Sequence, residues 1–431
     1  MNEQPTPTPE KSKLKWVISG VIGGIVLLIV AVILIVVLAN KPKEPAGEAS
    51  KKEEISKEYT ITPSATALSY AGSKVYDACN LISFDTIRKN IDNYQSLLDT
   101  VGTDRRPTEP LTIEHNYIDR DISAPLGKDG QERTKGTVIG GSGEEGITPY
   151  LSTLDSSCWY GQGEDISLGS GKTFVKTYVI QKPTPISGEL LGYVNSLQPA
   201  ASENGINAYV DSKRDSSNFV TVFAINAAKD TIAVFKTGSQ KLAEGAANDL
   251  AKALSEPPKG PVTVTYPKPW QAMPNPCELL TAADFERYTG KTASAIANDS
   301  IWLTDVGDNQ MQRSCERLEV ERLNAGETSE SHVTVRIAKN VDEAKKYVNG
   351  LKADETDTIE VQPLPQAIEG ADDAYVRIEG VINKRYSLEM RVGEKFLGVT
   401  VLGEAGQEDS IDVYVERMRP IVMEVLGRFK E

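Results

Sequence analysis

The chain has 431 residues and carries 47 Lys and Arg against 61 Asp and Glu, a formal net charge of −14. This acidic balance repels polyanions, so nucleic acid and anionic lipid head groups are excluded as expected partners. The length is more than one small hydrophobic core requires and favours two folded domains.

Residues 1–15 are polar and proline-spaced, and we predict that they form a short cytoplasmic tail. Residues 16–39 follow as an uncharged apolar block with Ser19 as its one polar side chain. At about 1.5 Å per residue, such a helix exceeds the roughly 30 Å hydrocarbon core of a bilayer, so it predicts a single transmembrane helix. A signal peptide cleaved after Ala39 is the alternative, although apolar cores of signal peptides span only about 7–15 residues.

Gly20 and Gly24 lie four residues apart inside this apolar block. This spacing allows two membrane helices to approach closely, and it therefore predicts a dimer contact. Glycine also occurs in single spans, so a monomer stays open. The partner that residues 16–39 predict in either case is the membrane.

All four cysteines lie on the C-terminal side of the apolar block, and the chain has only two histidines. An even number of thiols with so few histidines favours disulfides over a zinc site, and disulfides persist outside the reducing cytosol. We therefore expect a single-pass protein of the cell membrane, with its N-terminus in the cytoplasm and its C-terminal domains outside. Four free thiols in a cytosolic protein are the alternative.

Two segments of biased composition divide the outer part of the chain. Residues 40–66 begin with a run rich in Lys, Glu and Pro, and we predict a disordered stalk there. Residues 255–276 contain seven prolines in 22 residues, which precludes a helix and favours an extended linker. The predicted domains are therefore residues 67–254 and 277–431.

An internal repeat relates these two domains. Residues 78–85 of the first match residues 276–283 of the second, and each run contains a cysteine followed by a short helical stretch. In the second copy, Thr281 and Asp284 have the spacing of a capping box, and Gly290 is placed to end the helix.

The remaining elements also recur in the same order in both halves. Each half has a strand after its second cysteine, then a helix, three further strands and a closing amphipathic helix. This order predicts an α+β fold made twice, with an antiparallel sheet covered by helices in each domain. The predicted strands are 174–180, 205–210, 219–225 and 231–235, then 333–337, 370–376, 386–392 and 396–402; the helices are 188–196, 242–254, 342–351 and 411–429.

The repeat also selects one of the three ways to pair four cysteines. It predicts the disulfides Cys79–Cys158 and Cys277–Cys315, which would attach the first helical segment of each half to the sheet. Closing loops of this size contributes on the order of 4 kcal/mol in chain-entropy estimates.

The second half resembles the uncharacterised paired-cysteine domains of actinobacterial envelope lipoproteins in residues 276–281, Cys315 and residues 370–375. It is also similar to the extracytoplasmic sensor domains of some actinobacterial serine/threonine kinases. The resemblance covers most of residues 277–431 and, more faintly, residues 79–254. The chain departs from it in having no lipobox cysteine and no cytoplasmic kinase. The resemblance implies a ligand-binding or sensor-like role in the envelope, with no active site to carry over.

Few residues have the pattern of a catalytic or cofactor site, and we predict no catalytic residue, metal or cofactor. Alternation places His332 on the polar side of a strand, whereas His115 lies in a run that we interpret as a polar loop. Residues 169–173 end like a phosphate-binding loop, but Ile166 stands where its leading glycine is required.

The most notable polar cluster is Asp372 and Asp373 beside Tyr375, at the start of a predicted strand. Loop residues in such places often carry function, so these three are candidate ligand-binding residues. Turn formation by Asp and Gly explains the same residues equally well.

We therefore predict a membrane-anchored, non-enzymatic binding or sensor-like protein of the cell envelope, with an unknown envelope ligand or protein partner. Two alternatives stay open. One is an envelope enzyme, such as a wall-modifying hydrolase that uses carboxylates alone, and the other is a passive structural spacer.

Overall fold

The computed structural model divides the chain into residues Met1–Glu54 and Ile55–Glu431, and every residue that it describes belongs to the second unit. The predicted tail, the predicted membrane helix with Gly20 and Gly24, and the stalk up to residue 59 lie outside the described residues. Among the helices that are described, none is both long and apolar enough to cross a membrane. The described residues are 60–90, 112–126, 156–161, 173–181, 186, 188–213, 219–265, 273–304, 310–320, 330–338, 340–353, 359–364, 366–380, 385–402 and 410–430.

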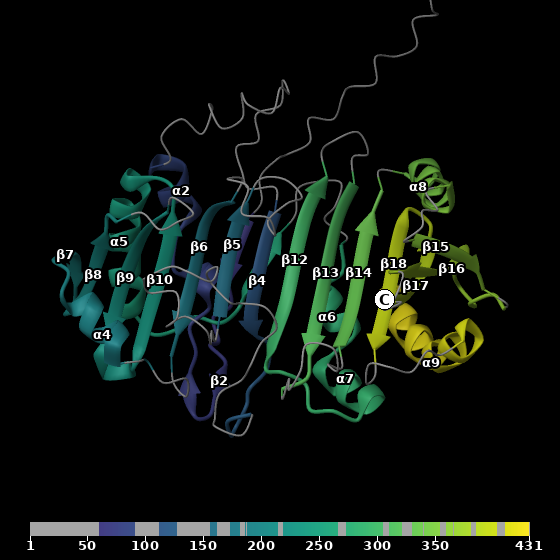
Figure 1. Cartoon of the computed structure of the whole chain (residues 1–431), viewed down its shortest axis with the longest axis horizontal. Helices are drawn as coiled ribbons and strands as arrows, with labels where there is room; N and C mark the ends of the chain where they lie inside the picture. Colours follow the sequence, from purple (N-terminus) through teal and green to yellow (C-terminus); the bar gives the residue numbers. More distant parts are fainter. Residues whose placement is uncertain are drawn as a thin grey trace, which may run out of the picture. The chain divides into compact units, whose positions relative to one another are not determined.

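Fourteen strands of the described residues form one antiparallel sheet that runs through both halves of the repeat (Figure 1). Two pairs of strands lie apart from it: β1 (Thr60–Pro63) with β11 (Val262–Thr265), and β2 (Ser69–Tyr70) with β3 (Ser73–Lys74). In order across the sheet, the strands are β15 (Ile359–Pro363), β16 (Asp373–Glu379), β17 (Arg385–Val392), β18 (Lys395–Leu402), β14 (Glu330–Ile337), β13 (Gln310–Leu318), β12 (Ile296–Thr304), β4 (Thr112–Ile118), β5 (Ser156–Gly161), β6 (Thr173–Ile180), β10 (Thr231–Thr237), β9 (Val220–Asn226), β8 (Ile206–Asp211) and β7 (Pro199–Glu203).

The strand order reads the same from either edge once each strand is replaced by its repeat counterpart. β4 and β12 are counterparts, and they pair with each other in the middle of the sheet, with Ile113 opposite Ile301 and Asn116 opposite Asn298. The two halves are therefore related by an approximate two-fold axis between these strands. The sequence predicted a sheet in each half, and the structure joins the two sheets edge to edge.

The helices lie on both faces of this sheet. One large apolar cluster holds one face together in both halves, with the closing helices α5 and α9 packed on it. On the other face, smaller clusters join α4 to β6, β8, β9 and β10, and α8 to β15, β16 and β18. The described helical segments are η1 (Ala78–Asn80), α2 (Phe84–Asn90), α4 (Gly188–Asn195), η3 (Ala227–Lys229), α5 (Gln240–Ser255), α6 (Pro276–Leu279), α7 (Ala282–Thr289), α8 (Val341–Ala353) and α9 (Ile411–Lys430).

The start of the described chain is tied to the segment between the two halves. β1 (Thr60–Pro63), in the predicted stalk, pairs antiparallel with β11 (Val262–Thr265), in the predicted linker. The backbone N–H of Val262 also donates to Asp77 Oδ2 at 3.0 Å, next to the first disulfide. A strand over residues 262–265 agrees with the extended backbone that the prolines of this segment favour.

Local signals in the sequence located most of the helices and strands. Thr281 and Asp284 form the predicted capping box, and Gly290 ends α7 in the left-handed conformation with φ 69°. The prediction that His115 lies in a polar loop is wrong, because His115 is a buried residue of β4. β4 and β12 carry polar residues on both faces, so neither shows the apolar alternation that marks a strand.

Removal of either disulfide will lower the free energy of unfolding by about 4 kcal/mol in the chain-entropy estimate. The double variants Cys79→Ala with Cys158→Ala, and Cys277→Ala with Cys315→Ala, test this by urea denaturation of the full chain in mild detergent. Equal midpoints for the variants and the parent chain would contradict it.

Candidate functional site

The two disulfides occupy equivalent places in the two halves and have the predicted pairing. Cys79 of η1 is bonded to Cys158 of β5, and Cys277 of α6 is bonded to Cys315 of β13. The Cα atoms lie 5.0 and 5.1 Å apart, and all four cysteines are buried. Each disulfide therefore attaches a short helical segment to the sheet.

A row of four buried side chains crosses the junction between the halves. In the sheet register, Cys158 is opposite His115, His115 is opposite Asp299, and Asp299 is opposite Cys315. Directly opposed residues in antiparallel strands point to the same face, so these side chains lie on the face that α5 and α9 cover.

Each charged or polar member of this row has a partner from its own half. His115 Nε2 lies 2.8 Å from Asp77 Oδ2, and the His115 ring stacks on Tyr117 with centroids 4.3 Å apart. The Arg313 guanidinium donates to both carboxylate oxygens of Asp299. Buried polar groups that are paired in this way avoid the large desolvation cost of unpaired groups. We therefore assign this row a structural role.

Asp77, Cys79 and His115 bring a carboxylate oxygen, a sulfur and a ring nitrogen within 4.8 Å of one another. These are the ligand types of a zinc or iron site. The Cys79 sulfur is already bonded to Cys158, however, and a disulfide sulfur is not a thiolate ligand. The cluster therefore holds the disulfide region together and is not a metal centre in this covalent state.

Asp372, Asp373 and Tyr375 lie together, as the sequence suggested, but internal partners satisfy all three. Arg391 donates from Nη1 to Asp372 at 3.0 Å and from Nε to Asp373 at 2.8 Å. Tyr375 is buried and donates its hydroxyl to Glu389 at 2.9 Å. The side chains of Asp372 and Asp373 are still 52% and 37% exposed, and a ligand-binding role for the three residues stays a prediction.

The other face of the sheet carries two rows of polar side chains over its six middle strands. Together we call these two rows the polar strip. One row, across β6, β5, β4, β12, β13 and β14, is Lys176, Trp159, Glu114, Ser300, Ser314 and Thr334; the second, across β5 to β14, is Ser157, Asn116, Asn298, Glu316 and His332.

Two members of the polar strip are in unusual environments. The Trp159 indole Nε1 is buried with no hydrogen-bond acceptor among the described residues, while the Lys176 ammonium lies 4.2 Å from a Trp159 ring centroid. Burial raises the pKa of Glu114, the positive charge of Lys176 opposes this shift, and the negative charge of Glu316 adds to it. The polar strip thus combines an aromatic ring with charges of both signs.

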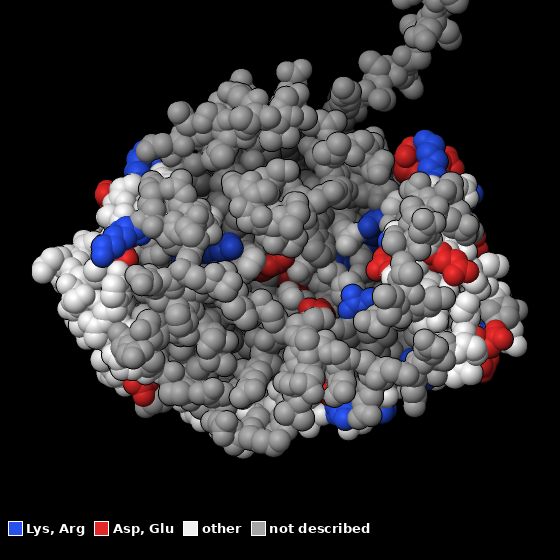
Figure 2. Space-filling view, viewed as in Figure 1, with Lys and Arg blue, Asp and Glu red and all other residues white. Residues whose placement is uncertain are grey.

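In Figure 2, acidic and basic atoms are visible at a few separate places over the middle strands of the sheet. Within the described part of the chain, α4 packs on β6, β8, β9 and β10 with Trp159 against the same cluster, α8 packs on β15, β16 and β18, and neither cluster includes β4 or β12. His332, which the sequence placed on the polar side of its strand, does lie in the polar strip.

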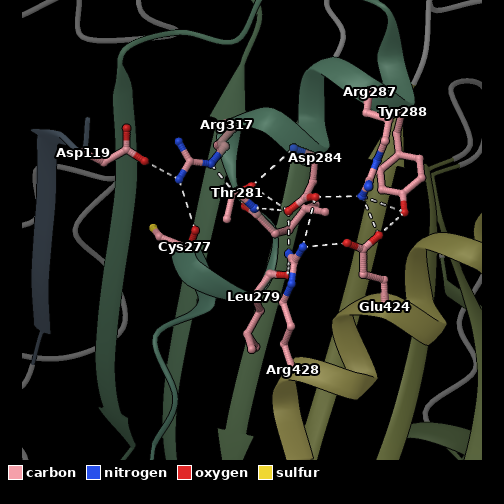
Figure 3. A network of polar contacts seen from close by, with 11 residues as sticks. Asp119, Cys277, Leu279, Thr281, Asp284, Arg287, Tyr288, Arg317, Glu424 and Arg428 are labelled. Carbon is pink, nitrogen blue, oxygen red and sulfur yellow. Dashed lines mark hydrogen bonds and ion pairs between the residues drawn. The ribbon is translucent and has the colours of Figure 1, made fainter. Parts of the chain in front are cut away.

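A second polar network joins α6 and α7 to β13 and α9 (Figure 3). Arg317, which is 2% exposed, donates to Asp119 at 2.5 Å and to the carbonyl oxygens of Cys277 and Leu280 at 3.2 Å. Since Asp119 directly follows β4 of the first half, this ion pair also connects the two halves.

Arg428 of α9 lies at the centre of the rest of this network. It donates to the Leu279 carbonyl at 2.9 Å, to Asp284 Oδ2 at 2.5 Å and to Glu424 at 2.6 Å (Figure 3). Burial raises the pKa of Asp284, but hydrogen bonds from Arg428 and Thr281 outweigh it and hold that pKa at about 2. The closing helix is therefore held to the disulfide-bonded segment by charge-assisted hydrogen bonds.

The described part of the first half contains a pocket of about 260 Å³ between η1 and the C-terminal turn of α5. Its wall includes the backbone or side chains of Leu81, Asp249, Lys252 and Ala253. The remaining lining residues are Tyr76, Asp77, Asn80, Ser83, Glu256, Pro257 and Lys259.

The sequence signals pointed to the cysteines but not to the polar strip or the pocket. Both are formed by segments that are far apart in the chain, such as those of Leu81 and Ala253, which line the same pocket. The alternation of His332, Thr334 and Val333 was the one available signal, and it identified a single strand of the polar strip.

No protein-family model, curated protein or solved structure matches this chain. The resemblance to actinobacterial envelope lipoproteins and kinase sensor domains therefore stays a prediction.

Asp284 makes the stability of the protein depend on pH in the acid range. Because its folded-state pKa of about 2 lies below the ordinary Asp value of about 3.9, its contribution is full above about pH 4 and is lost as the pH falls towards 2. We expect Asp284→Asn to remove on the order of 2 kcal/mol at neutral pH and to flatten this pH dependence. Urea denaturation from pH 6 to pH 2 measures both effects.

The control is Asp412→Asn, at an exposed position in the first turn of α9. It should keep the pH dependence of the parent chain. An unchanged pH profile for Asp284→Asn would show that the Arg428 contacts do not stabilise the charged carboxylate.

Proposed function

We propose that this protein binds or senses a ligand or partner at the outer side of a cell membrane, with residues 16–39 as its anchor and without catalysis. The ligand contact is the polar strip in the middle of the sheet. The observation that carries this proposal is the composition of that strip, in which an aromatic ring and side chains of both charges line one face of six strands, with Ser157, Ser300 and Ser314 buried among them.

The location outside the cytosol is supported by the two disulfides. Both are fully formed, both are buried, and no cysteine of the chain is left free. Disulfides of this structural kind persist in oxidising compartments and are rare in the cytosol. An extracytoplasmic position for residues that follow the predicted anchor accounts for them.

The binding role is supported by the cost of leaving polar groups buried without partners. Trp159 Nε1 is such a donor among the described residues, and it belongs to the same row as Glu114 and Lys176. An unsatisfied buried donor costs about 1–3 kcal/mol, so it needs an explanation. A ligand acceptor would recover this cost once it displaces the atoms that cover Nε1, because that nitrogen is buried.

The hydrolase alternative is favoured by one observation. Glu114, with a raised pKa, and Glu316 lie in adjacent rows of the polar strip, on strands that flank β12. Paired carboxylates in unequal environments are typical of acid and base catalysts. Activity on a glycoside or peptide of the cell wall, lost in Glu114→Gln, would support this alternative over binding alone.

The compartment can be tested in cells that express the full chain. We expect all four cysteines to resist alkylation before reduction, and a reporter fused after Glu431 to be active only in an extracytoplasmic form. Mass spectrometry of untreated material and a reporter assay measure these outcomes. Alkylation of every thiol would contradict the proposed location.

The binding surface can be tested by capture of envelope components on the full chain in mild detergent. We expect Trp159→Ala and Lys176→Ala each to reduce capture at least tenfold, because they remove neighbouring contacts on one surface. The control Val413→Ala changes an exposed apolar residue of α9, away from the strip, and should capture as the parent does. Equal capture by all four chains would rule out the strip as the contact surface.

A further inference from the structure

The repeat provides an internal template for the pocket of the first half. α5 and α9 are the closing helices of the two halves, and their burial patterns coincide when residue 254 is aligned with residue 429. Six positions are then buried in both helices: 243, 246, 247, 250, 251 and 254 in α5 correspond to 418, 421, 422, 425, 426 and 429 in α9.

This alignment makes Ala253 the counterpart of Arg428, and Asp249 the counterpart of Glu424. The cysteine motifs independently make Leu81 the counterpart of Leu279. In the second half, Arg428 donates to the Leu279 carbonyl and to Glu424. In the first half, Ala253, Asp249 and Leu81 all line the pocket.

The pocket therefore occupies the place that the Arg428 side chain fills in the other half. Substitution of alanine for arginine removes the guanidinium but leaves two of its acceptors. The Leu81 carbonyl has no donor among the described residues, and Asp249 forms no ion pair within the same part of the chain. Asp249 does accept from the Ser83 backbone N–H at 3.2 Å, which orients its carboxylate.

We infer that this pocket binds a guanidinium group, held by the Leu81 carbonyl and the Asp249 carboxylate as Arg428 is held by Leu279 and Glu424. Both acceptors are of the kind that a planar guanidinium fork satisfies. The first half offers the guanidinium one carboxylate fewer than the second half does. Thr86 lies three residues after the cap Ser83, at the position that Asp284 has after the cap Thr281.

The other charges around the pocket define the rest of the ligand. Glu256 is paired with Lys259 at 3.6 Å, and Asp77 is committed to His115 and to the Val262 N–H. The Lys252 ammonium has no ion pair among the described residues and lies one helical position before Ala253. A ligand that carries a carboxylate as well as a guanidinium, such as arginine, would pair with it.

A volume of about 260 Å³ is at the small end for ligand pockets, which suits an arginine side chain or a free small molecule. The guanidinium therefore has two sources, a soluble arginine-like solute or an arginine of a partner polypeptide. The pocket lies on the face of the sheet that α5 and α9 cover, and the polar strip lies on the opposite face.

Isothermal titration calorimetry of the full chain in detergent tests the pocket with L-arginine, the peptide Gly-Arg-Gly and L-citrulline. Citrulline replaces the guanidinium by a neutral urea of similar shape. We expect arginine or the peptide to bind at least tenfold more tightly than citrulline, and the tighter of the two identifies the source. Equal affinities for all three, or no binding, would overturn the inference.

Asp249→Asn should weaken arginine binding at least tenfold with the melting temperature unchanged. Its control is Glu244→Gln, on an exposed position of α5 outside the pocket, which should bind as the parent does. Wild-type affinity in Asp249→Asn would contradict the assigned carboxylate.

Ala253→Arg restores the template residue and should fill the pocket from within. We expect it to raise the melting temperature and to abolish arginine binding, and we expect Ala253→Met, which adds volume without charge, to give no rise. Adding Asp249→Asn to Ala253→Arg should cancel the rise. If Ala253→Arg raises the melting temperature no more than Ala253→Met does, the guanidinium geometry inferred for the first half is wrong.

Discussion

The antiparallel pairing of β4 with β12 is the constraint on which the rest of the structure depends. It converts two repeat halves, each with its own sheet and closing helix, into one sheet with a shared apolar core. Ile113 and Ile301 meet there in the core, and His115 and Asp299 meet in the next row. Because both polar residues are bonded within their own halves, the junction buries charge without leaving it unpaired.

The two halves pack the same elements together but differ in the side chain between the closing helix and the disulfide-bonded segment. Each attaches a short helical segment to the sheet by a disulfide, and each places a closing helix beside that segment. In the second half, Arg428 fills the space between them and gives Asp284 a depressed pKa. In the first half Ala253 leaves a pocket, so a position that stabilises one half is available for a ligand in the other.

The two faces of the sheet are covered by helices to different extents. The face covered by α5 and α9 holds the disulfides and the continuous core, whereas on the opposite face the clusters of α4 and α8 do not include β4 or β12. The polar strip lies between those two helices, on strands whose inner faces are already fixed by the core. Because the core fixes the inner faces of these strands, the backbone at Glu114, Trp159 and Lys176 is held in place, which would lower the entropic cost of binding the proposed ligand.

The sequence by itself determined the local elements and the disulfide pairing. Helix caps such as Thr281 and Gly290, the apolar spacing of α5 and α9, and the repeated cysteine motifs are local signals, and each identified its element or pair. Tertiary structure alone decided that β4 and β12 are strands and that they pair. Their inward positions include His115 and Asp299, and their outward positions include Glu114 and Asn298, so both faces are polar and no alternation is visible. Only the partners Asp77 and Arg313, brought from outside these strands, make those inward residues compatible with a core.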